Sequence, residues 1–478
     1  MRLWWGQPTR GRSDVRVLTL PRPRLQVPPA WGIEPVPAAY RRLGFLDFFA
    51  LWSSLGVGLL VLAAGGLLVP GMSPRAALGA IVLGTLIGNL LLALTGLVGS
   101  RTALPTMVLL RPVLGLRGSY LPTVLNVVQL VGWGAFEVYI MAQAADAVSR
   151  QLVGLHRPAL WALLFATIAT LLALGGPLVV VRRWLERFAI WLVYATTLYL
   201  TGYLLTHHDL RALLAGQGTG ALPFWLGVDL VVAMPVSWMP LVADYNRFAQ
   251  RPAAAFWGTY LGYFLANVWF YALGALFVLA LRTQEVIPAV LSVAGGALAL
   301  LLLLVDETDN AFANIYSTAL SLQNIVPRAP QRLLIVLVGA LCFVVAVNVN
   351  LVAYEAFLFL IGAVFVPLFG VLAADYFVPG GRARAPLSQA AADGAARAEG
   401  AGRGVSVPGL VAWAVGFLVY QWIAPTALPG WEGALRAAFT AVGLPFPLRD
   451  VVPWLGGSVP GFLAALVASA LLRGVWPR

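Results

Sequence analysis

The fold is decided first by residues 45–69, which read FLDFFALWSSLGVGLLVLAAGGLLV. An α-helix crosses the hydrocarbon core of a bilayer in about 20 apolar residues, so this stretch is long enough to span a membrane. It is also longer than the apolar part of a secretory signal peptide, which indicates that no leader is cleaved from the basic, proline-rich segment before it. Of the 478 residues, 60% are hydrophobic and only 10% are charged. The sequence therefore predicts an all-α polytopic membrane protein.

Apolar runs separated by Gly, Pro and Arg predict about twelve transmembrane spans. The eighth run is too long for one straight crossing, and we expect it to be split or tilted. The predicted spans lie near residues 45–69, 76–98, 120–148, 158–180, 185–206, 225–246, 255–281, 287–323, 332–349, 351–378, 408–424 and 456–475.

The positions of the arginines predict which side of the membrane each loop faces. All 31 basic residues are Arg, and 24 of them fall in segments that are cytoplasmic if the amino terminus is inside. This asymmetry follows the positive-inside rule. We therefore expect a multi-pass protein of the inner (plasma) membrane with both termini in the cytoplasm. A nucleic-acid-binding face is not expected, because the arginines lie at span ends.

Two interruptions indicate that the first ten spans form an inverted repeat. Such paired broken helices expose backbone carbonyls and helix ends to a ligand at the membrane midplane. The alternative is that these Gly and Pro residues serve only helix packing. Span 1 is interrupted by Ser53, Ser54, Gly56 and Gly58, and span 6, five spans later, by Pro235 with Ser237. We predict a cytoplasmic tail (1–44), two five-helix repeats (45–206 and 225–378), a cytoplasmic loop (379–407), and two final spans with a tail (408–478).

An aromatic ring and a carboxylate are predicted to share one face of span 3. Glu137 lies one helical turn after Trp133, so both side chains project the same way. A flat ring that carries N–H groups would stack on the Trp and donate to the carboxylate. Trp238, preceded by Ser237 and expected just past the break in span 6, is a candidate for the opposite face. The alternative is that both tryptophans pack in the core and that Glu137 pairs with another helix.

Span 8 carries a run that is too polar to face lipid and is predicted to line a cavity or an ion path. Oxygen ligands of this kind suit Na⁺, and a desolvated Asp can also hold a proton, so both cations remain open. Asn314 nearly shares a helix face with Asp309, which would place substrate and cation side by side. The run comprises Asp306, Glu307, Thr308, Asp309, Asn310, Asn314 and Ser317. Near the end of span 6 we expect Asp244 to pair with Arg247.

Other classes of function lack the residues they need. The three histidines fall between spans, and the single cysteine, Cys342, lies in an apolar run, so we expect neither a disulfide framework, a cysteine metal site nor a cofactor. We see no catalytic constellation of an enzyme and no filter or charge ring of a channel. A secondary transporter that functions as a monomer remains, with the bilayer and a small molecule as its partners.

Four motifs resemble the nucleobase–cation symporter family, the purine, cytosine, hydantoin and allantoin permeases, and most of all its hydroxymethylpyrimidine and cytosine permease-like members. The resemblance runs from about residue 34 to 378. The motifs are GSYLPTVLNVVQLVGW in span 3, SWMPLVADYNRF in span 6, FANIYSTALSLQN in span 8 and YEAFLFLIGAVFVPLFGVLAADYF in span 10.

This resemblance implies a leucine-transporter-like fold of five plus five inverted spans with two more, alternating access, and Na⁺ or H⁺ coupling. It places a ring between Trp133 and Trp238. It implies edge contacts from Gln129 or Glu137 on span 3 and from Asn314 on span 8. A cation would be held by span 1, in the region of Ser53, Ser54 and Gly56, and by Thr308, Asp309 and Asn310 of span 8.

Two positions depart from the family pattern. Glu137 stands where relatives carry an amide or an apolar residue, which favours an amino-substituted or cationic ring. Asp309 and Asn310 replace a pair of hydroxyl residues that form the usual Na⁺ site. This replacement favours a proton as the coupling cation. The candidate substrates are pyrimidines, purines, hydroxymethylpyrimidine, hydantoin and allantoin. The alternative is an amino-acid transporter of the same fold.

Overall fold

The computed structural model describes residues 31–177, 190–283, 286–349, 354–378, 404–426 and 430–475. The tail before residue 31, the boundary between spans 4 and 5, and most of the predicted loop 379–407 lie outside these ranges. Strand pairing in the described residues is limited to an isolated bridge between Leu43 and Ala249.

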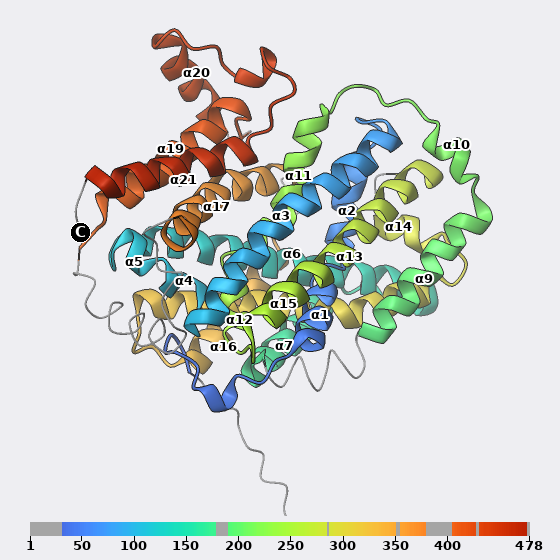
Figure 1. Cartoon of the computed structure of the whole chain (residues 1–478). Helices are drawn as coiled ribbons and strands as arrows, with labels where there is room; N and C mark the ends of the chain where they lie inside the picture. The colour runs from blue at the N-terminus through green and yellow to red at the C-terminus, as the bar shows by residue number, and fades with distance from the viewer. Residues whose placement is uncertain are drawn as a thin grey trace, which may run out of the picture.

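The described elements are almost all helices, drawn in Figure 1. In the first half they are α1 (Phe45–Ser54), α2 (Leu59–Leu67), α3 (Pro74–Thr102), α4 (Thr106–Leu109), α5 (Arg111–Leu114), α6 (Tyr120–Val153), α7 (Pro158–Gly175), α9 (Ile190–His207), α10 (Leu210–Leu214), α11 (Phe224–Trp238) and α12 (Val242–Asn246). The second half has α13 (Pro252–Leu281), α14 (Val286–Leu291), α15 (Gly296–Ile325), α16 (Gln331–Ala346), α17 (Tyr354–Phe377), α19 (Val407–Ile423), α20 (Trp431–Ala441) and α21 (Ser458–Val475).

Helix length and composition agree with a membrane protein. Among the described helices, α3, α6, α7, α13 and α17 are long and apolar enough to cross a bilayer, and α1 with α2 forms a bent sixth candidate. The helices α11, α16, α19 and α21 are apolar but shorter. The predicted split of the eighth run is confirmed, because α14 and the 30-residue α15 are separate helices. With α15 and α9, these helices match the twelve predicted runs.

The break in the first span lies where the small residues predict it. The axes of α1 and α2 differ by 61°, and residues 55–58 join them. A Cβ atom at Gly56 would lie 2.9 Å from the Ala266 Cβ of α13, so the chain passes too close to that helix for a larger residue.

The break in the sixth span lies later than predicted. α11 continues through Pro235 to Trp238, and the helix is interrupted at residues 239–241 before α12 begins. Pro235 packs against α3 at Gly88, which leaves room for its ring. Membrane helices tolerate an internal proline where a neighbouring helix supports it. Trp238 is therefore the last residue before the break, not one just past it.

The helices form two groups. In the first, α1, α2 and α3 pack on α13, while α11 and α12 pack on α3. In the second, α6, α7, α15 and α16 pack on one another. α17 packs on α11 and carries α19 and α21, which lie at one side of the molecule in Figure 1. The two broken spans belong to the first group, and the polar faces of α6 and α15 belong to the second.

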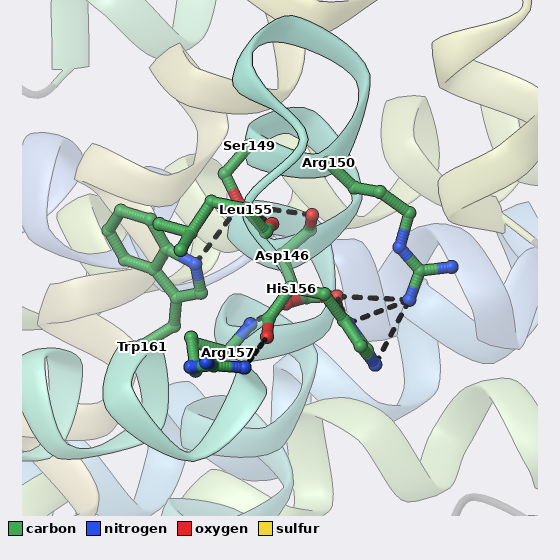
Figure 2. A network of polar contacts seen from close by, with 7 residues as sticks. All are labelled: Asp146, Ser149, Arg150, Leu155, His156, Arg157 and Trp161. Atoms are coloured by element: carbon green, nitrogen blue, oxygen red, sulfur yellow. Dashed lines mark hydrogen bonds and ion pairs between the residues drawn. The ribbon is translucent and has the colours of Figure 1, made fainter.

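The turn between α6 and α7 is fixed by a buried carboxylate (Figure 2). Asp146 accepts a hydrogen bond from the Arg157 backbone N–H at 2.7 Å, and its Oδ2 lies 2.7 Å from His156 Nδ1. The Trp161 indole donates to Ser149 Oγ at 3.2 Å across the same corner. His156 therefore serves the turn outside the spans, as the sequence predicts.

A second buried carboxylate fastens the carboxy-terminal helices to the core. Asp229 of α11 accepts hydrogen bonds from the N–H groups of Gly457, at 2.6 Å, and Ser458, at 3.0 Å. These donors lie at the start of α21, where a helix favours an anion. The contact was not predicted, because residues 229 and 457 are far apart in the chain.

Asp229→Ala is expected to lower the thermal unfolding midpoint in detergent, because unsatisfied buried donors cost about 1–3 kcal/mol each. Asp209→Ala is the matched control, since Asp209 caps α10 locally at an exposed site. The loss of such a cap costs about 1 kcal/mol. Equal shifts in the two variants would show that Asp229 adds nothing beyond an ordinary helix cap.

Candidate functional site

A closed cavity lies between the two helix groups, beside the break between α1 and α2. Its volume is about 10 Å³, which is room for about one water molecule. A space of this size is too small for a heterocyclic ring. The break, α11 and α15 contribute most of the other lining residues, and the predicted ring-contacting residues that line it are Trp133, Glu137, Ser237, Trp238 and Asn314.

The two tryptophans are held by other aromatic rings. Trp133 packs edge-on against Tyr354 and Phe357 of α17, with ring centroids 5.8 and 5.3 Å away. Trp238 packs edge-on against Trp52 of α1 at 6.3 Å. The Trp133 indole N–H is buried and has no hydrogen-bond partner in the described part of the chain. Both rings thus reach the cavity, one from each helix group, and their stacking on a ligand remains a prediction.

Gln129 does not line the cavity. Its Nε2 donates to Asn126 Oδ1 at 2.9 Å and to the backbone oxygen of Ser237 at 3.1 Å. The Gln129 side chain therefore holds the backbone at Ser237 in place and lies behind the residues that line the cavity. Of the two edge contacts considered on span 3, only Glu137 faces the cavity.

Glu137 is part of a buried carboxylate pair that joins α6 to α15. Its side chain lies within hydrogen-bonding reach of Glu307. In the described part of the chain, no ion pair links either carboxylate to an arginine. Two acids without a cationic partner at this depth favour an N–H donor between or beside them.

Glu307 also holds the break in the first span, a role that the sequence did not reveal. One carboxylate oxygen accepts the backbone N–H of Leu59, the first residue of α2. Asn310 adds a second link, because its Nδ2 donates to the backbone oxygen of Val57 at 3.1 Å. The sequence indicated only that a buried acid in span 8 needs a hydrogen-bond donor. The backbone N–H groups at the start of α2 supply that donor.

The other acids of α15 lie against α1. Ser54 donates to Asp306 at 2.5 Å. Asp309 is fully buried, and neither of its oxygens has a well-formed hydrogen bond in the described residues, although Ser54 lies close by. Such unpartnered oxygens suit a small cation. Across the described residues, however, no three His, Cys, Asp or Glu side chains are grouped to hold a metal, so Na⁺ would also need hydroxyl or backbone oxygens.

Three of the predicted cation-binding residues point elsewhere. The Ser53 hydroxyl donates to the Ala50 backbone oxygen and accepts from Tyr194. Gly56 faces α13, and the Thr308 hydroxyl donates to the Val305 oxygen of its own helix. The structure thus brings Ser54, Asp309 and Asn310 together with Asp306 and Glu307.

The predicted pairing of Asp244 with Arg247 is not the main contact of either side chain. Asp244 Oδ1 accepts the Thr106 backbone N–H at 2.9 Å. Arg247 is fully buried and bridges three segments: its Nη1 donates to the Gly32 oxygen at 2.7 Å and its Nη2 to the Tyr316 hydroxyl at 3.3 Å. Its Nε donates to the Asp244 backbone oxygen. Arg247 therefore ties the amino-terminal segment, α12 and α15 together.

Two groups of membrane helices around a small central cavity form the architecture of a membrane transporter. The chain belongs to the family of permeases for cytosine/purines, uracil, thiamine and allantoin, whose family model matches residues 35–435. This confirms the family that the motifs indicated.

Individual relatives agree with this assignment. The chain is 24% identical to the hydantoin permease of Microbacterium maritypicum over 72% of this chain and 75% of that protein. It is 26% identical to the cytosine permease of Escherichia coli K12 over 66% and 73%.

Solved structures confirm the fold. Mhp1, a nucleobase-cation-symport-1 family transporter, in a closed conformation with bromovinylhydantoin bound, matches with a TM-score of 0.75 and 21% identity over 93% of this chain and 96% of Mhp1. Its inward-facing conformation matches with a TM-score of 0.72 and 22% identity over 93% of each chain. The same fold therefore exists in more than one state of the transport cycle.

Proposed function

We propose that this protein is a symporter that imports a flat nitrogen heterocycle together with Na⁺ or H⁺. Candidate substrates are pyrimidines, purines, hydroxymethylpyrimidine, hydantoin and allantoin. The observation that carries the proposal is the convergence of Trp133, Glu137, Trp238 and Asn314 on one closed cavity.

Each group suits one property of such a ring. An indole face stacks on any flat π-system, and such stacking is worth about 1–3 kcal/mol. Glu137 accepts from a ring N–H or an exocyclic amino group, which favours substrates rich in donors. Asn314 donates to the Asn310 backbone oxygen at 3.0 Å, which fixes its amide beside the cavity.

The coupling cation would bind between α1 and α15, at Asp306, Asp309 and Ser54. A cation there neutralises acids that have no arginine partner and draws the first helix group onto the second. The same segment of α15 holds the start of α2 through Glu307 and Asn310. Cation binding to this segment would therefore also affect the break between α1 and α2, which lies beside the ring. Ring and cation would then stabilise one closed state, which is what symport requires.

A thermal-shift panel on purified protein tests the proposal. Purines, pyrimidines, hydroxymethylpyrimidine, hydantoin and allantoin are each added with and without Na⁺ at two pH values. A ligand that binds the folded state raises the unfolding midpoint. A shift that needs Na⁺ identifies sodium, and a shift that follows pH alone identifies a proton. Shifts from amino acids only would favour the amino-acid transporter instead.

A further inference from the structure

Trp238, which lines the central cavity, is supported from behind by a second tryptophan. This residue, Trp52, lies on α1 two residues before that helix ends, and its side chain is fully buried. The two indoles pack edge-on, with ring centroids 6.3 Å apart and planes at 84°. Trp52 lies outside the cavity wall, so it can act on a ligand only through Trp238.

Trp52 is itself fixed in place by a hydrogen bond. Its indole N–H donates to Asn246 Oδ1 at 3.1 Å, and the Asn246 amide donates onward to Thr259 Oγ1 at 2.9 Å. Asn246 is fully buried and lies so close to α3 that a Cβ atom at Gly96 would come within 2.2 Å of its Nδ2. Buried polar networks whose members have partners are rigid. The Trp52 ring is therefore held in one orientation behind Trp238.

The rings and the amide around Trp52 all belong to the first helix group. Its ring contacts Tyr245 of α12 at 6.3 Å and Tyr263 of α13 at 6.4 Å, and Trp238 ends α11. These helices pack on one another through α3 and α13. Because the contact between Trp52 and Trp238 does not cross the cavity, a change in the spacing of the two groups would leave it intact.

Close packing behind Trp238 limits how far its ring can recede from a ligand. Protein interiors are as dense as organic crystals and hold no spare volume for a displaced indole. The cavity in front of Trp238 has a volume of about 10 Å³, so a ring must gain its space by displacing the surrounding walls. A wall that cannot recede favours small ligands over large ones. In tight pockets, one methylene group is enough for discrimination of about 10- to 200-fold.

We propose that Trp52 is a positioning residue that sets the size of the ring accepted by the central cavity, by holding Trp238 from behind. The inference rests on the proposed function, because it needs a ring that stacks on Trp238. Loss of the Trp52 indole leaves a space that the surroundings fill only in part, and Trp238 can tilt into it. A small ring then loses its close contact with Trp238, while a large ring gains room.

Trp52→Ala tests this role with two ligands that differ in size but share their edge groups. Cytosine and adenine are both flat and both offer a ring N–H and an exocyclic amino group to Glu137, and adenine has a second fused ring. Hydantoin and bromovinylhydantoin form a second pair. Equilibrium binding to the purified protein gives the dissociation constants. In Trp52→Ala the ratio of the constant for the larger ligand to that for the smaller should fall about tenfold.

Two further variants separate positioning from a general loss of packing. Phe48→Ala removes a fully buried ring one turn earlier on α1, where Phe48 packs against α13 at Gly258. Both alanine variants should unfold at a lower temperature than the wild-type chain, but Phe48→Ala should keep the wild-type ratio. Trp52→Phe keeps a ring behind Trp238 and loses the indole N–H, so its ratio should shift less, in the same direction. It carries the test if Trp52→Ala does not fold.

The outcomes distinguish this role from the proposed function. If folded Trp52→Ala binds both ligands of a pair more weakly by the same factor, the ratio is unchanged and Trp52 does not set ring size. Heterocycle binding by the wild-type chain would then still support the proposed function. Failure of every heterocycle in the thermal-shift panel to shift the wild-type protein would overturn the proposed function itself.

Discussion

Trp133→Ala is expected to weaken heterocycle binding strongly while leaving a folded protein. The indole forms part of the cavity wall, and its loss removes a stacking partner worth about 1–3 kcal/mol, or roughly fivefold to 150-fold in affinity. Trp238→Ala should have the same effect from the opposite helix group. Trp133→Phe keeps a flat face and should retain part of the affinity. Equilibrium binding and uptake into proteoliposomes measure these effects.

Trp413→Ala is the matched control for the loss of a buried indole. Trp413 is 6% exposed, against 5% for Trp133, and lies on α19 with its N–H bonded to the Val364 oxygen. Truncating a buried Trp costs about 3–5 kcal/mol of stability wherever it lies, so both variants should lose stability. Of these two variants, only Trp133→Ala should bind the ring more weakly. Normal binding in both Trp133→Ala and Trp238→Ala would eliminate the stacked-ring arrangement.

Asp309→Asn is expected to abolish concentrative uptake while preserving binding of the ring. The amide has the shape of the carboxylate but no charge, so it cannot neutralise a cation between α1 and α15. Uptake should then stop at equal concentrations on the two sides of the membrane, whatever gradient is imposed. Proteoliposomes with either a Na⁺ gradient or a pH gradient measure this directly, and the gradient that drives the wild-type protein identifies the cation.

Asp209→Asn, at the exposed start of α10, is the control for the general loss of an acid. Asp306→Asn provides a second test within the same cluster, because Asp306 accepts from Ser54. If Asp309→Asn keeps the Na⁺ and pH dependence of the wild-type chain, then Asp309 has no part in coupling. If Asp309→Asn fails to bind the ring and also unfolds at a different temperature from the wild-type chain, Asp309 has a structural role instead.

Properties that depend on local sequence could be predicted from the sequence. Hydropathy located the apolar runs that fold into helices, because the bilayer acts on each helix separately. Helical periodicity placed Trp133 and Glu137 on one face, and both line the cavity. The acids of span 8 were recognised as special because lipid does not tolerate them.

Contacts between distant segments needed the tertiary structure. Neither the support of Leu59 by Glu307 nor the anchoring of α21 by Asp229 leaves a local pattern. Pro235 predicted a break in the wrong place, because packing against Gly88 supports the helix through the proline. The sequence by itself thus determined the membrane class, the family and the apolar runs that become helices, and it supplied the candidate residues of the site. Only the tertiary structure decided which residues face the cavity, because burial and partner choice depend on how separate helices pack.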